Sequence, residues 1–400
     1  MELDPQFFVK RSMKSRTLVL LGSTGSIGRA TLEVVKRHPG AFQIKALAAF
    51  SNVPMLIQQY REFEPEYICL VDKSKARELA MAFAGEKVRI LVGADELVSL
   101  AGLQDADLVV NAVVGAAGLR ASLEAVEHGK VLALANKESL VAGGPLFQPL
   151  LAAGKANIIP IDSEHSAIWQ AMLCGKNSEV RNIILTASGG PFRDRPRESF
   201  DRITVEDALN HPTWKMGPKI TIDSATLVNK GLEVIEAATL FRIPANKVKV
   251  VIHRQSIVHS LVEFIDSSVI AQMSKPDMRL PITYALFWPE RVDSQFGQLD
   301  WSALRDLTFE LPDYEKFPLL QLAYEVASAG GTAPAVYNAA NEVAVAAFLR
   351  KEIKFTDLFE LVTEAVHEMA SSPVNSLDDI LEADRKARET VQRRLQEVKC

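Results

Sequence analysis

Short apolar runs alternate with amphipathic stretches from Arg16 to Ile161. The runs are rich in Val and Leu and predict buried strands, while the stretches at 30–36 and 54–63 have helical spacing. Strands that alternate with helices are typical of a parallel, doubly wound sheet. We therefore expect an α/β fold here, with strands at 16–21, 42–49, 66–71, 107–114, 130–134 and 158–161.

The pattern changes after Ser163, where apolar runs at 180–186, 248–253 and 269–273 predict the strands of a second α/β unit. A polar, proline-bearing stretch at 193–210 lies between the first two runs. Long surface segments often act as lids, so we expect a mobile flap there. Alanine-rich apolar stripes predict a C-terminal helical bundle with helices at 319–329, 333–349, 357–370 and 377–398.

A chain of 400 residues exceeds one comfortable core, so several domains are expected. We place a leader at 1–13, which is a flexible leader, a cloning remnant or part of a longer targeting segment. The doubly wound domain follows at 14–162, the second α/β unit at 163–292, a connector at 293–313 and the helical domain at 314–400.

Composition narrows the function classes. A formal charge of −5 gives no support to a nucleic-acid surface, and no apolar run is long enough to span a membrane. The leader lacks the apolar core of a secretory signal. Three scattered cysteines do not form a disulfide framework, so we expect a cytoplasmic protein.

The segment GSTGSIG at 22–28 follows a strand and opens a helix. Its glycines let the backbone approach a pyrophosphate, and the helix N-terminus adds amide donors, so we favour a Rossmann-like nucleotide site over a glycine turn that only packs. The second strand ends in Phe50-Ser51-Asn52 without the acid that usually binds an NAD ribose. This end of the strand favours NADP.

Asp162 and Glu164 are separated by one residue directly after an apolar strand. If the extended geometry persists, both carboxylates face one way, and Glu233 supplies a third oxygen for Mg²⁺ or Mn²⁺. The alternative is that Asp162 caps a helix that starts near His165, with Glu164 in its first turn.

Further polar groups also follow apolar runs. Lys137 stands where ligands meet an open α/β sheet, unless it is a surface lysine paired with Glu138. The other groups suit a phosphate monoester and a covering aromatic side chain, although turns, helix starts and a buried tryptophan would look similar; they are Ser188-Gly189-Gly190, Ser224, Asn229, Lys230, His211 and Trp214. His253 and His259 are expected in the core or in strands rather than at a metal.

At these residues the chain resembles the 1-deoxy-D-xylulose 5-phosphate reductoisomerases of the non-mevalonate isoprenoid pathway, from about Thr17 to about Arg388. The resemblance is carried in order by LGSTGSIG, LANKESLV, PIDSEHSAI, ASGGPFRD, HPTWKMG, IDSATLVNKGLEVIEA and NAANEVAVAAFL.

The resemblance implies a homodimer whose subunits have an NADPH domain, a catalytic and dimerisation domain and a C-terminal helical domain. It implies Mg²⁺ or Mn²⁺ at Asp162, Glu164 and Glu233. It implies a phosphorylated ketose at Lys137, Ser163, Glu164, Ser188, His211, Ser224, Asn229, Lys230 and Glu233, with Trp214 on the flexible flap. It implies NADPH at Thr24, Gly25, Ser26, Ile27, Asn136, Glu138 and Gly217.

One departure concerns Ser51 and Asn52, which we also assign to the cofactor: the family commonly has Gly-Lys-Asn or Gly-Arg-Asn where this chain has Phe50-Ser51-Asn52. The implied reaction is a metal-assisted rearrangement of the ketose phosphate, by a retro-aldol/aldol or an α-ketol route. Reduction by NADPH then gives 2-C-methyl-D-erythritol 4-phosphate, with Lys137 and the three carboxylates as catalytic residues. Two alternatives are a plain NADP-dependent dehydrogenase that needs no metal and a non-catalytic nucleotide sensor on the same fold.

Overall fold

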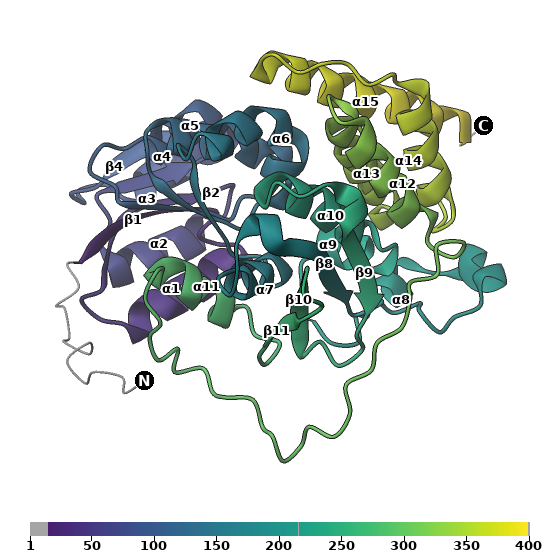
Figure 1. Ribbon diagram of the computed structural model, residues 1–400. Helices are drawn as coiled ribbons and strands as arrows, with labels where there is room; N and C mark the ends of the chain where they lie inside the picture. The colour runs from purple at the N-terminus through teal and green to yellow at the C-terminus, as the bar shows by residue number, and fades with distance from the viewer. Residues whose placement is uncertain (1–14, 215, 399–400) are drawn as a thin grey trace, which may run out of the picture.

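The structure is a computed structural model that describes residues 15–214 and 216–398. The predicted leader at 1–13 lies outside the described residues. The chain forms two α/β units side by side, and a set of C-terminal helices packs on top of both (Figure 1). The predicted fold class is therefore confirmed.

The first unit is built on a seven-stranded parallel sheet in the order β4-β3-β2-β1-β5-β6-β7. Alternate residues of β1 enter the cores on opposite faces, Leu18 and Leu20 on one and Val19 and Leu21 on the other. A sheet buried on both faces explains the nearly continuous apolar runs in the sequence. The strands are β1 Arg16–Leu21, β2 Phe42–Ala49, β3 Tyr67–Leu70, β4 Arg89–Val92, β5 Leu108–Asn111, β6 Val131–Leu134 and β7 Asn157–Pro160.

Strand order reverses between β1 and β5, and ligands of doubly wound sheets bind at such a switch point, outside the carboxyl ends of the strands. Strand β4 was not predicted, because Arg89–Val92 is short and only half-buried at the sheet edge. The helices of this unit are α1 Ser26–Arg37, α2 Val53–Phe63, α3 Ala76–Ala82, α4 Ala94–Ala101, α5 Leu119–Glu127 and α6 Lys137–Ala152.

The second unit holds a four-stranded sheet in the order β11-β10-β8-β9. The predictions found β8 Val180–Ala187, β9 Val248–Ile252 and the edge strand β11 Val269–Met273, but missed β10 Val258–Phe264 at the centre. The polar members of β10, such as Ser260, interrupt its apolar run although the strand is largely buried. The helices are α7 Ser163–Met172, α9 Pro218–Ala225, α10 Val228–Leu240 and α11 Arg279–Phe287, and α11 packs against α1 of the first unit (Figure 1).

The predicted flap at 193–210 is not a loose loop. It contains a 3-10 helix at Arg197–Arg202 and the short helix α8 at Val205–Leu209. Phe200 is 1% exposed and its ring contacts those of Phe192, Phe317 and Phe355. Aromatic burial of this kind packs Phe200 against the body of the protein. The expected mobility of the segment stays a prediction.

The segment at 293–313 runs as an irregular arc below the second sheet (Figure 1). After it come α12 Pro318–Ala329, α13 Ala333–Leu349, α14 Asp357–Glu368 and α15 Leu377–Val398, close to the predicted helices. Helices α12 and α13 lie against α10 and α6, so the C-terminal helices reinforce the walls of the cleft described below. Within 15–214 and 216–398, no helix combines the length and apolar character that a bilayer span requires.

Candidate active site

A cleft of about 800 Å³ lies between the two α/β units. The start of α1 and the ends of β6 and β7 line one side, and the starts of α7, α9 and α10 line the other. The segment from Pro276 to Arg279, which precedes α11, completes the wall. The polar clusters from the sequence therefore meet at the switch-point edge of the parallel sheet.

The glycine-rich loop has the predicted strand–turn–helix context. Gly22 has φ +84°, and a Cβ on it would lie 2.5 Å from the carbonyl oxygen of Ala112. A Cβ on Gly28 would lie 2.2 Å from the carbonyl oxygen of Gly22. Both positions therefore require glycine for close backbone approach. Gly25 is the N-cap of α1, and the first turn, all of it described, carries no acidic side chain or capping hydrogen bond.

This free helix start suits an anion. Ser26 and Ile27 line the cleft beside it, and Thr24 precedes them in the same loop. Ser51 and Asn52 lie apart, at the end of β2, and neither is among the cleft-lining residues of the described chain. The Asn52 Oδ1 accepts from the Met55 N–H at 3.1 Å and so caps α2.

Asp162, Glu164 and Glu233 converge as predicted, with one carboxylate oxygen of each within 4.8 Å of the others. The predicted reason was wrong, because the chain does not stay extended after Asp162: this residue is the N-cap of α7, and Glu164 is in the first turn. The capping alternative placed both residues correctly at the helix start, but the Asp162 side chain makes no capping hydrogen bond within the described chain. Glu233 approaches from α10 and is fully buried.

Two lysines balance these carboxylates. Lys137 Nζ lies 3.0 Å from Asp162 Oδ2 and 3.4 Å from Glu233 Oε1. Lys230 Nζ lies 2.8 Å from Glu164 Oε1 and also pairs with Glu233. Lys137 is buried, so the alternative of a surface lysine paired with Glu138 is wrong.

Burial and charge oppose each other in this cluster. Burial acts against the charged form of Lys137, yet the facing Asp162 and Glu233 carboxylates raise its pKa above the ordinary lysine value. The pKa of Asp162 is lowered, because Lys137 and His165 outweigh its burial. The pKa of Glu233 is raised by burial and by the negative charge of Glu164. A divalent cation would relieve this carboxylate repulsion.

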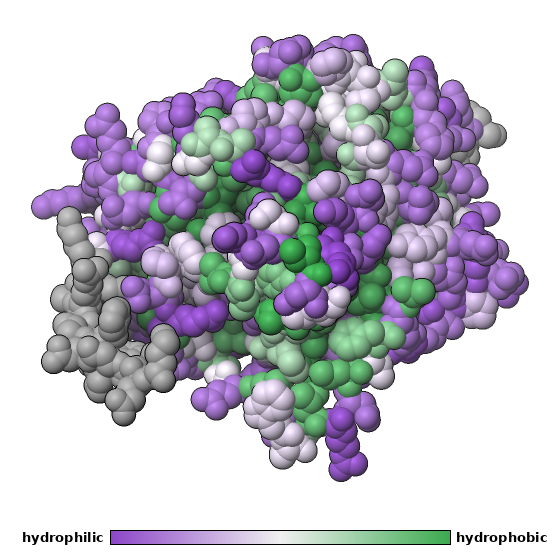
Figure 2. Space-filling model, viewed as in Figure 1, coloured by the Kyte–Doolittle hydropathy of each residue, from purple (hydrophilic) through white to green (hydrophobic). Residues whose placement is uncertain are grey.

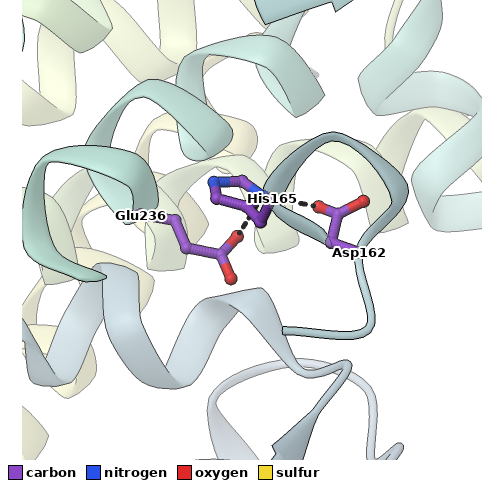
Figure 3. Close-up of side chains that lie close together, drawn as sticks. All are labelled: Asp162, His165 and Glu236. Atoms are coloured by element: carbon purple, nitrogen blue, oxygen red, sulfur yellow. Dashed lines mark ion pairs between the residues drawn. The ribbon is translucent and has the colours of Figure 1, made fainter. Parts of the chain in front are cut away.

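A second cluster of titratable side chains, centred on His165, lies next to the carboxylates and lysines. His165 Nδ1 is 3.4 Å from Asp162 Oδ2 and 3.6 Å from Glu236 Oε2, and both ion pairs are drawn in Figure 3. Burial together with Asp162 raises the pKa of Glu236 to about 7, against the opposing effect of His165. Sequence reasoning missed Glu236, although it lies one turn after Glu233 on the same helix.

Of the two carboxylate sets, the all-oxygen set Asp162, Glu164 and Glu233 fits Mg²⁺ or Mn²⁺ better than the set with His165 and Glu236. All three members of the oxygen set line the cleft, whereas Glu236 is 1% exposed in the interior. Asp162 Oδ2 is buried and has ion-pair contacts but no hydrogen-bond partner among the described residues, so it keeps capacity for a cation.

A separate polar group surrounds His211. Its Nε2 lies 3.0 Å from Ser188 Oγ and 3.1 Å from Ser224 Oγ. Its Nδ1 accepts from the backbone N–H groups of Thr213 and Trp214, so Nε2 carries the hydrogen in the neutral ring. Burial, with a smaller effect of Arg193, lowers the pKa of His211 to about 4. These groups line the cleft together with Asn229, Lys230 and Trp214 and offer donors to an anion.

Gly190 has φ +67°, and a Cβ on it would lie 2.5 Å from the Ser224 carbonyl oxygen. The turn after Ser188 therefore needs glycine to approach α9. His253 is fully buried and serves the fold, since its Nε2 accepts from the N–H groups of Ile257 and Val258. His259 lies on β10, as predicted for a strand residue, and its side chain also reaches the cleft.

The remaining predicted residues lie at the edge of the cleft or next to it. Ser163 and Gly217 line it, and Gly217 is the N-cap of α9. Asn136 and Glu138 are buried just behind it, where Glu138 Oε1 pairs with Lys219 Nζ at 3.0 Å. Sequence reasoning did not single out Lys219, and its spacing of four residues from Asp223 was the only local signal.

Family models match most of the chain. The model described as 1-deoxy-D-xylulose 5-phosphate reductoisomerase matches residues 18–144, and the one described as the C-terminal domain of that enzyme matches 158–241. A model described as the DXP reductoisomerase C-terminal domain matches residues 273–390.

Whole proteins match as well. The 1-deoxy-D-xylulose 5-phosphate reductoisomerase of Chlorobaculum tepidum is 52% identical over 377 residues, which cover 94% of this chain and 98% of that protein. The enzyme of the same name from Thermosynechococcus vestitus is 49% identical over 381 residues, covering 94% and 92%.

Among solved structures, the reductoisomerase of Zymomonas mobilis in complex with NADPH has a TM-score of 0.89 at 43% identity, covering 95% of this chain and 99% of that one. A DOX-P reductoisomerase in complex with NADPH, fosmidomycin and magnesium has a TM-score of 0.89 at 40% identity, covering 96% and 99%. The chain belongs to the 1-deoxy-D-xylulose 5-phosphate reductoisomerase family.

Proposed function

We propose that this chain converts 1-deoxy-D-xylulose 5-phosphate to 2-C-methyl-D-erythritol 4-phosphate with NADPH and a divalent metal ion. The observation that carries the proposal is the meeting of two sites in one cleft. The Asp162, Glu164 and Glu233 carboxylates lie in the same cavity as the free N-terminus of α1. A metal-assisted rearrangement followed by a reduction needs both sites next to each other.

Asp162, Glu164 and Glu233 would hold Mg²⁺ or Mn²⁺, which supplies Lewis-acid polarisation of the substrate oxygens. Lys137 and Lys230 pair with the same carboxylates, and their ammonium groups are free to turn to substrate oxygens when a cation takes over the pairing. Both lysines are buried, so their charges act in a site that largely excludes water.

Ser188, His211 and Ser224 would hold the phosphate end of the substrate, with Asn229, Lys230 and Ser163 between it and the metal site. The neutral His211 donates through Nε2, and the two serine hydroxyls rotate to donate to the same anion. Trp214 lies on the cleft wall next to His211 and would cover the bound ligand. Binding far from the reacting carbons would help to position them.

NADPH, which supplies the hydride, would lie with its pyrophosphate at Thr24, Gly25, Ser26 and Ile27. Gly217 at the start of α9, with Asn136 and Glu138 behind the wall, would border the nicotinamide side. Ser51 and Asn52, at the end of β2, would meet the 2′-phosphate. Ser51 stands where the family commonly has Lys or Arg, so this contact has no cation at position 51, and the exposed Phe50 stands in place of the family's glycine.

A homodimer is also proposed. Strand β11 is the edge of its sheet, and the exposed side chains of Ile265 and Val269 lie at that edge. Trp301 on the connector is 70% exposed, and Figure 2 shows hydrophobic surface along the lower edge of the molecule, where the connector runs in Figure 1. A second copy would cover this surface. Light scattering of the purified protein would give twice the 44.0 kDa chain mass, and a monomer at micromolar concentration would refute it.

We also propose a division into domains at 14–162, 163–292 and 314–400, joined by 293–313. One apolar core includes residues of all three parts, so the domains pack closely against one another. A cytoplasmic location is proposed as well, since Cys69 is free and buried and Cys174 is free and exposed. Cell fractionation would test the location.

The direct test follows NADPH absorbance with 1-deoxy-D-xylulose 5-phosphate, with Mn²⁺ and with excess chelator. We expect turnover that needs both the ketose phosphate and the metal. Full activity in chelator would favour the plain dehydrogenase, and the absence of any oxidation would favour the nucleotide sensor.

A further inference from the structure

The segment Asn338-Ala339-Ala340-Asn341-Glu342 on α13 has no part in the site described above, yet two neighbouring members reach out of the helical bundle. Asn341 Nδ2 donates to Asp223 Oδ1 on α9 at 2.8 Å. Glu342 Oε1 accepts from the backbone N–H of Ala116 at 3.2 Å. One turn of a C-terminal helix therefore contacts both α9 and the loop that follows β5.

The contacts continue from Asp223 around a closed ring. Asp223 Oδ2 lies 2.8 Å from Lys219 Nζ, which lies 3.0 Å from Glu138 Oε1. Glu138 Oε2 accepts from Asn136 Nδ2 at 3.0 Å. Asn136 Nδ2 also donates to the carbonyl oxygen of Gly115 at 2.8 Å, next to the residue that Glu342 binds. The ring joins α9, the start of α6 and the loop at 113–116.

Most of the ring is buried, with Lys219 and Glu342 partly exposed. Burial strengthens the polar contacts of the ring. Asn341, Asp223, Glu138 and Asn136 are all buried. Burial opposes the charged form of Lys219, but Asp223 and Glu138 raise its pKa above the ordinary lysine value, so it remains a cation. Removing any one member leaves a buried polar partner unsatisfied, which is costly in a low-dielectric interior.

The ring lies between residues that are proposed to bind the substrate and residues that are proposed to bind the cofactor. Helix α9 runs from Pro218 to Ala225 and carries Ser224, which lines the cleft and is proposed to bind the substrate phosphate. The opposite side of the ring consists of Asn136 and Glu138, which are proposed to bind the cofactor, and of the loop at the carboxyl end of β5. Asn341 itself acts only through Asp223.

We propose that Asn341 is a positioning residue that fixes the substrate-binding helix α9 relative to the cofactor-side residue Glu138. A ligand that orders α9 then also orders the cofactor loop, and the reverse holds, so each ligand strengthens the binding of the other. This inference rests on the proposed function and gives the C-terminal helical bundle a role in it.

The test measures this linkage. NADPH dissociation constants are determined by fluorescence with Mg²⁺ present, without and with saturating fosmidomycin, the ligand of the related structure described above. For the native protein we expect fosmidomycin to tighten NADPH binding by at least about 5-fold, the lower range of typical coupling between sites. In N341L, which keeps the side-chain size but donates no hydrogen bond, we expect the ratio to fall to within about 2-fold of one.

The matched control is Thr332→Val, at the start of the same helix. It removes one partly buried hydrogen bond, from the Ser372 N–H to Thr332 Oγ1 at 3.0 Å, without touching the ring. It should keep the native ratio even if its Tm falls. If N341L does not fold, the pair N341D and D223N/N341D replaces it. The single variant puts two carboxylates together and should lose the coupling, and the double variant reverses the hydrogen bond and should regain it.

A native ratio near one, or an unchanged ratio in N341L or in N341D, would overturn the inference. Failure of the proposed function is a separate result, because the native protein would then not oxidise NADPH with the ketose phosphate.

Discussion

Lys137 Nζ lies 3.0 Å from Asp162 Oδ2, inside the group of carboxylates proposed to bind the metal ion. Together with Lys230 it supplies two positive charges against the three carboxylates Asp162, Glu164 and Glu233, which leaves a net charge of −1. A divalent cation would therefore compete with ammonium groups for oxygens that are already in place. The lysines balance the carboxylates in this arrangement, and a metal ion held by Asp162, Glu164 and Glu233 would free the lysine ammonium groups for substrate oxygens.

Glu233→Gln removes one carboxylate charge from the proposed metal site while it keeps the side-chain size. We expect turnover at fixed Mn²⁺ to fall by about 100-fold, as when a group that supports a bound metal is lost. The NADPH dissociation constant should stay within about 2-fold of native, because Glu233 is not among the residues proposed to bind the cofactor. Steady-state kinetics and NADPH fluorescence check the two values, with the exposed Glu206→Gln as control. Equal losses in turnover and NADPH affinity would argue against the metal role.

Lys230→Met leaves Glu233 and Glu164 without their shared cation. Breaking a buried ion pair from one side costs about 3–5 kcal/mol in the free energy of unfolding. The control is Lys351→Met, which breaks the exposed pair with Glu206 and should leave the free energy of unfolding nearly unchanged. Urea unfolding in chelator compares the two variants. Mn²⁺ should reduce the difference in the free energy of unfolding between the two variants, since the metal ion would replace the missing positive charge. Equal losses of stability in both variants would contradict a buried ion pair at Lys230.

Asp162 and Asp223 show which contacts of the site the local sequence can predict and which it cannot. Asp162 follows an apolar strand within two residues of Glu164, so local pattern alone predicted a shared site, although the side chains converge through a helix start and not through an extended strand. Asp223 contacts Asn341, which lies 118 positions away, and no local spacing in the sequence predicts that contact. Long-range polar pairs depend on how whole elements pack.

Two errors in the fold have similar causes. Strand β10 was missed because Ser260 and Glu263 interrupt its apolar run, and only pairing with β8 and β11 makes it the centre of a sheet. The short helices within 193–210 were likewise not predicted, because charges and prolines interrupt the pattern of the segment. Its one decisive residue, Phe200, is buried by aromatic partners that come from beyond position 310.

The pH dependence of stability should report on His211. Burial lowers its pKa from 6.5 to about 4, so the unfolded chain takes up a proton first as the pH falls. The contribution of His211 therefore makes the free energy of unfolding fall progressively as the pH drops from 6.5 to about 4. Above pH 6.5 the neutral ring has no such effect. His211→Gln should reduce the loss of unfolding free energy across that window. Urea titrations at pH 7.5, 6 and 4.5 measure it, and identical profiles for both proteins would exclude a buried neutral His211.

Ser51→Arg should sharpen the choice of cofactor. Ser51 lies at the end of β2, where the proposed 2′-phosphate site has no cation of its own. A charge-assisted hydrogen bond from arginine contributes about 1.5–3 kcal/mol, so kcat/KM for NADPH relative to NADH should rise by at least about 10-fold. The gain should come from KM for NADPH and should shrink at high salt. The control is Ser74→Arg, an exposed serine of the same unit that we expect to leave the ratio unchanged. An unchanged ratio in Ser51→Arg would place the 2′-phosphate elsewhere.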